Sequence, residues 1–211
     1  MFQVPEVDEF PFTPGQFVSL SRDFGGKKIT RAYSIASAPR GNRFEISLNL
    51  IHDGFFSPFL FQMSPGDAVE TSVPLGYFVL KQPRREALFV ATGTGITPFR
   101  SMLEALPHEE QVHPATLLFG IRYQSTILYR REFEAMTERY PHFRFWPTLS
   151  RPDPDWKGRT GHVQAHLLEA FGERRDLDVY ICGLKLMVDD VRAKLKALGF
   201  DRKQIVYEKY D

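Results

Sequence analysis

Hydrophobic positions in the first eighty residues come in short runs, separated by turns rich in Pro and Gly. From Phe44 to Leu50 apolar and polar residues alternate, which is typical of a strand with one buried face. Closely spaced short strands with turn signals between them predict an antiparallel barrel or sandwich, with a short helix at Pro58–Met63. The predicted strands are Gln16–Leu20, Ala32–Ile35, Phe44–Ile51, Ala68–Val73 and Tyr77–Leu80.

The pattern changes after Lys81–Arg85, which we interpret as a linker. Ala87–Ala91 is a continuous apolar run, as expected for a strand buried on both faces. Strands and helical patterns then alternate, which predicts a doubly wound parallel sheet. The sequence therefore predicts two domains, an antiparallel β-barrel at residues 1–82 and an α/β domain at residues 83–211. Further strands are expected at 115–119, 143–149, 178–181 and 205–207, and helices at 97–106, 129–139, 163–171 and 186–198.

Composition narrows the range of functions. The 211 residues carry a formal net charge of +1, so no bulk field attracts nucleic acid. The single cysteine excludes an intramolecular disulfide and an iron–sulfur cluster held by several thiolates of this chain. There is no apolar run of about 18 residues and no signal-peptide pattern, so we expect a soluble cytoplasmic protein without a membrane partner.

The stretch Arg31-Ala-Tyr33-Ser34 has the residue types that a flavin nucleotide needs. Side chains alternate along a strand, so Arg31 and Tyr33 point the same way and Ser34 points opposite. A guanidinium can clamp a phosphate through its planar fork, and an aromatic ring can stack on a flavin. On its own, the stretch favours an ordinary strand that has an exposed Arg and a half-buried Tyr.

A second motif, Gly93-Thr-Gly95-Ile-Thr-Pro98, follows the buried strand at Ala87–Ala91. It predicts a glycine-rich turn and the start of a helix, with proline in the first helical turn. The free amides and positive helix end of such an arrangement suit a pyrophosphate. It differs from the Gly-x-Gly-x-x-Gly fingerprint because Pro98 holds the last position.

With Cys182-Gly183 after a later strand and Glu208-Lys-Tyr210-Asp211 at the end, these motifs resemble the ferredoxin–NADP+ reductase superfamily. The resemblance covers nearly the whole chain. It implies an FAD-binding barrel followed by a domain that binds NADP(H).

For the flavin, the resemblance implies that Arg31 binds phosphate, Tyr33 stacks on the ring and Ser34 lies near flavin N5. It places a second phosphate contact at Gly54-Phe-Phe56-Ser57, and it lines the flavin with Leu48 and Asn49. A basic residue often stands in the family where this chain has Asn49. Thr94 is expected to reach the flavin from the nucleotide side.

For the nucleotide, Gly93, Gly95, Thr97 and Pro98 are expected to bind the pyrophosphate. Ser150 and Arg151 resemble the family's 2′-phosphate site, and this favours NADPH over NADH. Arg122 and Arg159 are expected to add positive charge there, and His162 is expected to replace a tyrosine that stacks on this part of the nucleotide. The alternative is that Arg151 is a solvated loop residue.

The resemblance assigns three residues, Ser34, Cys182 and Glu208, to the transfer step. Cys182 is expected to guide the nicotinamide together with Gly183, rather than to act as a nucleophile. Glu208 is expected to relay a proton and Tyr210 to cover the flavin ring. The alternatives are an inert core cysteine and an exposed acid on an edge strand. Six histidines are scattered without a completing set of ligands, so no metal site is expected; His162 and His166 alone share helical spacing.

The implied activity is an FAD-dependent oxidoreductase that moves hydride between NADPH and FAD. Electrons would then pass between FAD and a protein carrier such as ferredoxin or flavodoxin. Two alternatives are an NAD(P)H-dependent reductase of free flavin or a quinone, and an electron-transfer subunit that a partner chain completes. Only thirteen residues precede Pro14, where the family's barrels carry a complete strand. The chain is therefore either truncated or has an open barrel edge, at which a second copy could pair to form a homodimer.

Overall fold

The computed structural model describes residues 1–106 and 113–210. Contacts divide them into two compact units. One unit contains Met1–Leu80 together with Thr97–Ala105, and the other contains Lys81–Ile96 and the described residues from Leu106 onward. The division differs from the predicted domains in two respects. The segment Thr97–Ala105 groups with the N-terminal residues, and Lys81 and Gln82 belong to the other unit.

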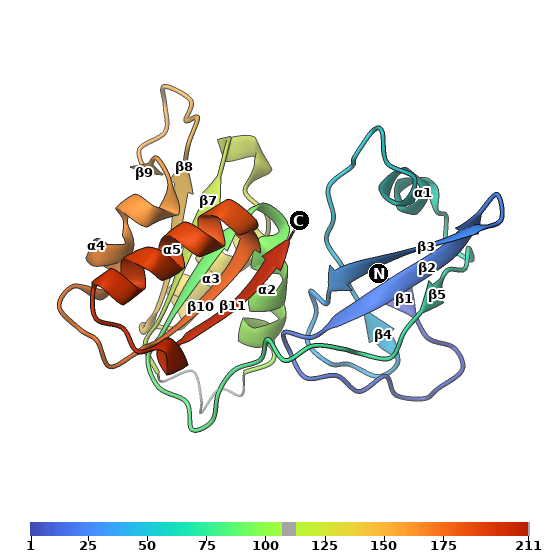
Figure 1. The fold of residues 1–211 in the computed structure, drawn as a ribbon, viewed down its shortest axis with the longest axis horizontal. Helices are drawn as coiled ribbons and strands as arrows, with labels where there is room; N and C mark the ends of the chain where they lie inside the picture. Colours follow the sequence, from blue (N-terminus) through green and yellow to red (C-terminus); the bar gives the residue numbers. More distant parts are fainter. Residues whose placement is uncertain (107–112, 211) are drawn as a thin grey trace. The chain divides into compact units, whose positions relative to one another are not determined.

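The N-terminal unit is built from antiparallel strands (Figure 1). Strands β2 (Phe17–Phe24) and β3 (Lys27–Ser34) form a hairpin, and β5 (Glu70–Thr71) pairs with the other edge of β2. The turn at Gly25 and Gly26 has φ of 64° and 85°, which glycine adopts without a steric cost. Strand β1 (Phe2–Gln3) pairs with β4 (Arg43–Phe44), so a short strand does precede β2.

Three predicted strands are shorter than expected or absent. The strand predicted at Ala68–Val73 is reduced to β5. The predicted strand at Phe44–Ile51 contributes only its first residue to β4, and Ile46 adds an isolated bridge to Ile35. The segment 77–80 forms no strand. Alternation of apolar residues marks which face is buried, but it does not guarantee a hydrogen-bonded neighbour along the whole run.

Phenylalanine fills the core of this unit. Val18 and Leu20 on β2 are fully buried, and Phe56 brings helix α1 (Phe56–Gln62) onto them. Helix α2 (Thr97–Glu104) belongs to the same unit, and the ring of its Phe99 lies 5.7 Å from that of Phe78. The remaining buried members of the core are Phe10, Phe12, Ile35 and Phe44.

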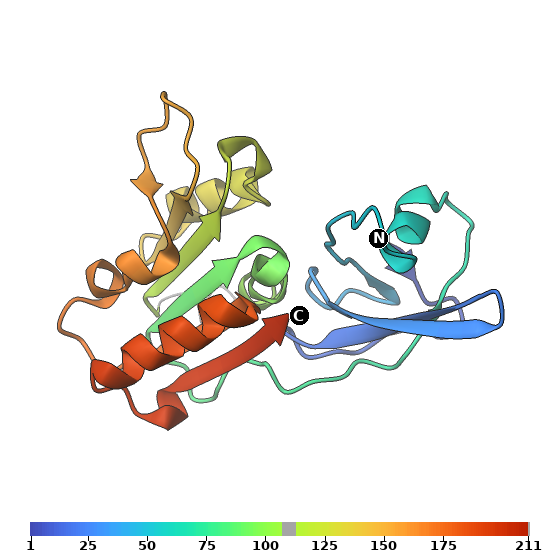
Figure 2. The same cartoon turned by 45° about the horizontal axis from the view of Figure 1, so that its top comes forward.

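The C-terminal unit contains a six-stranded parallel sheet in the order β11-β10-β6-β7-β8-β9 (Figures 1 and 2). The order runs in opposite directions on either side of β6, so a topological switch point lies between β6 and β10. The strands are β6 (Ala87–Thr92), β7 (Ala115–Ile121), β8 (Phe143–Leu149), β9 (Arg159–Thr160), β10 (Asp178–Leu184) and β11 (Ile205–Tyr210). The sequence did not predict β9, because two residues carry no periodicity.

Helices cover both faces of this sheet. Helices α4 (Leu167–Phe171) and α5 (Lys185–Ala197) pack on the face that presents Leu88, Val90 and Leu118. Helix α3 (Arg130–Arg139) packs on the other face, where Phe133 contacts Phe143 and Phe145. The predicted helix at 163–171 is divided into a 3-10 turn at Val163–Ala165 and α4. Among the described residues, every helix is too short or too polar to cross a membrane.

Candidate active site

Strand β3 carries the motif that was predicted to hold a flavin. Arg31 is exposed and its Nη1 donates to Thr30 O at 2.8 Å, whereas Tyr33 is half-buried and Ser34 is buried. Burial raises the pKa of the Tyr33 hydroxyl, and the nearby charge of Arg31 opposes that rise. The two side chains therefore lie close together on one face of β3, as the alternation of the strand predicts.

The second predicted phosphate segment is a closed turn. The Oγ of Ser57 accepts from Ile51 N at 2.9 Å, and Gly54 N donates to Ile51 O at 2.9 Å. Phe56 is 3% exposed and its ring lies 6.2 Å from that of Tyr33. The Ser57 hydroxyl and the Phe56 ring therefore stabilise this turn and the core behind it. Of the two residues predicted to line the flavin, Leu48 is partly buried and Asn49 is exposed.

The glycine-rich motif forms a 3-10 turn, Gly93–Ile96, directly before α2. A Cβ added at Gly95 would lie 2.2 Å from Cys182 O, so only glycine fits there. Gly93 adopts φ of 54° and has open space beside it, Thr94 is partly buried, and Pro98 is buried within α2. The turn therefore packs on the end of β10, which brings two of the predicted motifs together within one unit.

Two buried hydroxyls flank this turn. The Oγ1 atoms of Thr92 and Thr97 are buried and have no hydrogen-bond partner among the described residues. A Cβ added at Gly183 would lie 2.3 Å from Thr92 Oγ1, so only glycine leaves room for this hydroxyl. A buried hydroxyl without a hydrogen-bond partner costs free energy. The two threonine hydroxyls could recover it by hydrogen bonding to a bound polar group such as a dinucleotide. The sequence analysis missed Thr92, although it immediately precedes Gly93.

Cys182, Glu208 and Tyr210 meet at the ends of β10 and β11. Cys182 and Glu208 are register partners, and the Tyr210 hydroxyl hydrogen-bonds to the Cys182 sulfur. Burial, reinforced by the Glu208 carboxylate, raises the pKa of the Cys182 thiol well above its usual range, and the hydrogen bond from Tyr210 opposes this. The thiol is therefore protonated at neutral pH, which suits contact with a ligand and does not suit nucleophilic attack.

A cationic group forms where β7 and β8 end. The amide of Ser150 donates to Ile121 O and that of Arg151 donates to Arg122 O, each at 3.0 Å, so the two chain segments run on in parallel past the strands. Arg151 Nη1 lies 3.3 Å from the hydroxyl of Tyr123. This arrangement brings Ser150, Arg122 and Arg151 together, as predicted, and adds Tyr123, which the sequence analysis missed.

Arg159 lies on β9, where it is the register partner of Thr148 near the end of β8. Its guanidinium lies 3.6 Å over the Trp146 ring and forms an ion pair with Glu169. The hydrogen bond from Arg159 lowers the pKa of the Glu169 carboxyl, although burial opposes the shift. The charge of Arg159 is therefore already compensated by an acidic neighbour.

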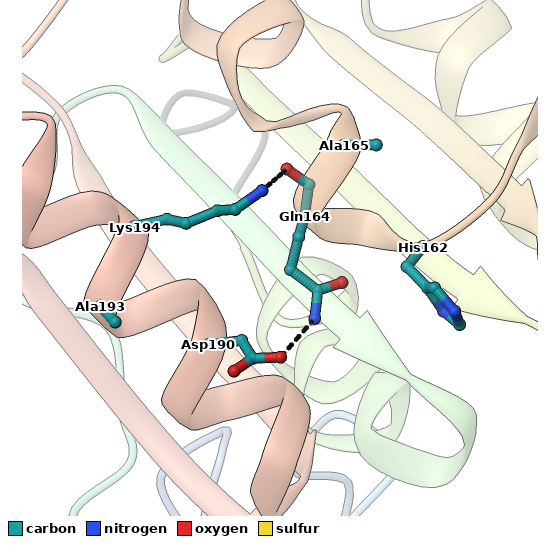
Figure 3. Close-up of a pocket in the computed structure, with 6 residues that line it drawn as sticks. All are labelled: His162, Gln164, Ala165, Asp190, Ala193 and Lys194. Carbon is teal, nitrogen blue, oxygen red and sulfur yellow. Dashed lines mark hydrogen bonds between the residues drawn. The ribbon is translucent and has the colours of Figure 1, made fainter.

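His162 lines an open pocket between the Val163–Ala165 turn and helix α5 (Figure 3). Gln164 Nε2 donates to Asp190 Oδ2 at 3.3 Å, and Lys194 Nζ donates to Gln164 O at 3.2 Å. The imidazole of His162 stands apart from these two hydrogen bonds in Figure 3. Within residues 1–106 and 113–210, no three His, Cys, Asp or Glu side chains are grouped as metal ligands. His108, one of the six histidines that were not expected to bind a metal, lies outside the described residues.

Comparison with known families supports both an FAD-binding and an NAD-binding domain. Residues 1–80 match the oxidoreductase FAD-binding domain, and residues 89–193 match the oxidoreductase NAD-binding domain. The chain thus has domains for both cofactors, FAD and NAD(P). Two residues predicted to be functional at the C-terminal end, Glu208 and Tyr210, lie beyond the second match.

Among curated relatives, ferredoxin–NADP reductase B of Sorangium cellulosum is 40% identical over 220 residues, which cover the whole of this chain and 90% of the relative. The toluate 1,2-dioxygenase electron transfer component of Pseudomonas putida is 30% identical, and the alignment covers 97% of this chain but 60% of that protein. NADH-cytochrome b5 reductase 1 of Dictyostelium discoideum is 28% identical over 97% of this chain and 73% of the relative.

Solved structures share the fold. A ferredoxin NADP+ reductase from Neisseria gonorrhoeae with bound FAD and NADP superposes with a TM-score of 0.84 at 24% identity, covering 95% of this chain and 87% of that one. The FAD/NAD-binding domain of nitric oxide dioxygenase from Vibrio cholerae gives 0.88 at 22% identity, covering 99% and 90%. Fold, domain matches and sequence identity agree, and the chain belongs to the ferredoxin–NADP reductase superfamily of FAD- and NAD(P)-binding oxidoreductases.

Proposed function

We propose that this protein is an NADPH-dependent reductase that transfers electrons through FAD to a separate ferredoxin- or flavodoxin-type carrier. The observation that carries the proposal is the group formed by Arg122, Ser150 and Arg151. In the described part of the chain, no carboxylate forms an ion pair with either arginine, so their charge is available for a 2′-phosphate. An NADH-binding site would instead place an acidic side chain where the ribose 2′-hydroxyl binds.

The proposal gives the chain's own residues the following roles. A bound nicotinamide nucleotide would supply hydride chemistry and a bound FAD would supply one-electron chemistry. Arg31 binds the flavin phosphate, Tyr33 covers the ring, and Ser34 offers a hydroxyl at its reactive edge. The Gly93–Ile96 turn seats the nucleotide pyrophosphate on its amides. Cys182 supports the nicotinamide as a neutral thiol, and Glu208 relays a proton near it.

The carrier is proposed to be a separate protein. A cluster held by several thiolates would need more than the single cysteine of this chain. The Sorangium relative is named for reduction between ferredoxin and NADP, and it matches this chain over 90% of its own length. This relationship supports ferredoxin as the first carrier to be assayed.

The experiment is an absorption spectrum of the protein with bound FAD, followed by anaerobic addition of NADPH or of NADH. NADPH should bleach the visible flavin band at a much lower concentration than NADH, and added ferredoxin or flavodoxin should then be reduced. A flavin that neither nucleotide reduces would overturn the proposal.

A second candidate is an NADH-dependent reductase component of an oxygenase. The 30% identity to the toluate dioxygenase component favours it, although this chain spans only 60% of that protein. In the same experiment, preferential bleaching by NADH would select this candidate.

A further inference from the structure

Helix α2 is bound to the backbone that follows the Arg31–Ser34 motif. Three of its side chains contact the three consecutive residues 36–38, all within the N-terminal unit. Arg100 Nη1 donates to Ala36 O at 3.0 Å, Ser101 Oγ donates to Ser37 O at 2.6 Å, and Glu104 Oε2 accepts from Ala38 N at 3.1 Å. The helix therefore has a fixed axial position on this segment.

Arg100 is the charged centre of this contact. Its side chain is only 13% exposed, and Nη1 also donates to Glu45 Oε2 at 2.9 Å and lies 3.6 Å from Glu104. Glu45 is itself joined to the same segment, because its amide donates to Ser37 Oγ and its carbonyl accepts from Ala36 N. A partly desolvated guanidinium needs the charges of these two carboxylates and the carbonyl oxygen. Moving helix α2 away from the segment would separate Arg100 from these partners and cost free energy.

Helix α2 begins directly after the glycine-rich turn that is proposed to bind the nucleotide. Thr97, its first residue, follows the Gly93–Ile96 turn without a spacer, and residues 95–99 are buried. At the other end of the contact, Ala36 is two residues beyond Ser34 along an extended backbone. A change at Arg100 would therefore be felt at the C-terminal end of the turn and at the end of the flavin motif.

We propose that Arg100 is a positioning residue for hydride transfer. It holds the start of α2 against the backbone that carries Ser34, and it acts on the two cofactors only through these segments. The inference rests on the proposed function, in which FAD binds at β3 and the nucleotide at the turn. Because a displacement of about 1 Å between reacting atoms can slow a reaction roughly 100-fold, the expected effect is on the rate of transfer.

The test compares Arg100→Met and Arg100→Lys with the FAD-loaded wild-type protein. The matched control is Arg130→Met, which removes an arginine from the surface ion pair with Glu134 on α3. Stopped flow gives the limiting rate of flavin reduction and the NADPH concentration for half-maximal rate. We expect Arg100→Met to lower the limiting rate by about tenfold or more while half-saturation changes less than about threefold. Arg100→Lys should recover part of the rate, and Arg130→Met should match wild type.

Two results would overturn the inference. One is an unchanged limiting rate in Arg100→Met, and the other is a slow rate that is fully explained by lost FAD or weaker NADPH binding. Hydrogen exchange of the same variants separates this outcome from failure of the proposed function. If wild-type FAD is not reduced, the proposed function fails, whereas the anchoring role still requires faster amide exchange at residues 34–38 and 95–99 in Arg100→Met. Unchanged exchange there would refute the anchoring role.

Discussion

Cys182 and Glu208 are register partners on the adjacent parallel strands β10 and β11, so their side chains emerge on the same face of the sheet. The carboxylate opposes ionisation of the thiol, and burial of the sulfur acts in the same direction more strongly. A neutral thiol beside a carboxylate provides an uncharged, polarisable surface and a proton acceptor at one place. This pairing is the basis of the first prediction.

Replacement Glu208→Gln should lower the pKa of the Cys182 thiol while leaving it protonated at neutral pH. The carboxylate's repulsion is lost, but burial, which is the larger cause, persists. The chain has a single cysteine, so the pH titration of one ¹³Cβ-labelled cysteine signal measures this directly. Glu173→Gln, which removes an exposed acid from the same unit, is the control. An identical titration in the Glu208 variant and wild type would show that the pairing has no electrostatic effect.

Asp178 is the subject of the second prediction. This buried carboxylate, at the start of β10, accepts from Lys81 Nζ at 2.7 Å and from Arg85 Nη2 at 3.0 Å. Burial alone would raise the pKa of Asp178, but the hydrogen bonds from Arg85 and Lys81 outweigh it, and the pKa is lowered. The ionised form therefore stabilises the fold above the unfolded-state pKa of about 3.9, and this stabilisation is lost as pH falls through the lower folded-state value.

Asp178→Asn should reduce the free energy of unfolding at neutral pH by about 3 kcal/mol, because it leaves two cations without their buried partner. The control is Asp176→Asn, since Asp176 binds the same Arg85 but its side chain is 96% exposed, and its loss should cost about 0–1 kcal/mol. Urea unfolding at neutral pH and near pH 3, below the unfolded-state pKa of aspartate, measures both variants. Two results would contradict the stabilising role of ionised Asp178. One is an equal loss of unfolding free energy in the two variants, and the other is an Asp178→Asn variant whose stability falls with acid as much as that of wild type.

The sequence predicted the parallel sheet well and the barrel less well, for a physical reason. The strands β6 and β7 are nearly continuous apolar runs because both of their faces are covered, and such runs are visible without knowing their neighbours. The strand expected at Phe44–Ile51 has the right alternation, yet only β4 and one bridge form. Pairing depends on partners distant in sequence, which alternation does not reveal.

The candidate site, too, could be predicted only where the relevant residues are close in sequence. The glycines Gly93 and Gly95 and the pair Ser150 and Arg151 could be proposed from the sequence because their spacing from strand ends is local information. The ion pair of Arg159 with Glu169 joins residues ten apart across a turn, and the contact of Arg100 with Ala36 joins residues sixty-four apart. Neither could be read from the pattern, because each depends on tertiary packing.

Gly95 gives a steric prediction. Its added Cβ would meet the backbone carbonyl of Cys182, which cannot move without displacing β10. We expect Gly95→Ala to destabilise the C-terminal unit by about 2 kcal/mol and to abolish saturable flavin reduction by NADPH. Gly172→Ala is the control for backbone strain without a steric clash, because Gly172 has φ of 58° with open space around it; its replacement should destabilise the same unit without affecting reduction. Normal nucleotide saturation in Gly95→Ala would refute the close packing of the turn on β10.

Arg151 is proposed to set the preference between the two nucleotides. Its backbone amide donates to Arg122 O and its guanidinium to the Tyr123 hydroxyl, with no carboxylate paired to it in the described residues, so Arg151→Ala removes a cation that a 2′-phosphate would bind. A charge-assisted hydrogen bond contributes roughly 1.5–3 kcal/mol, so NADPH should need about 10- to 100-fold higher concentration for half-maximal flavin reduction. NADH lacks the 2′-phosphate, and its half-saturation should change little. Arg144→Ala, which removes an exposed arginine from the same strand β8, is the control and should leave both nucleotides unaffected. Equal weakening of NADPH and NADH in Arg151→Ala would assign Arg151 to the shared part of the nucleotide and remove the support for NADPH preference.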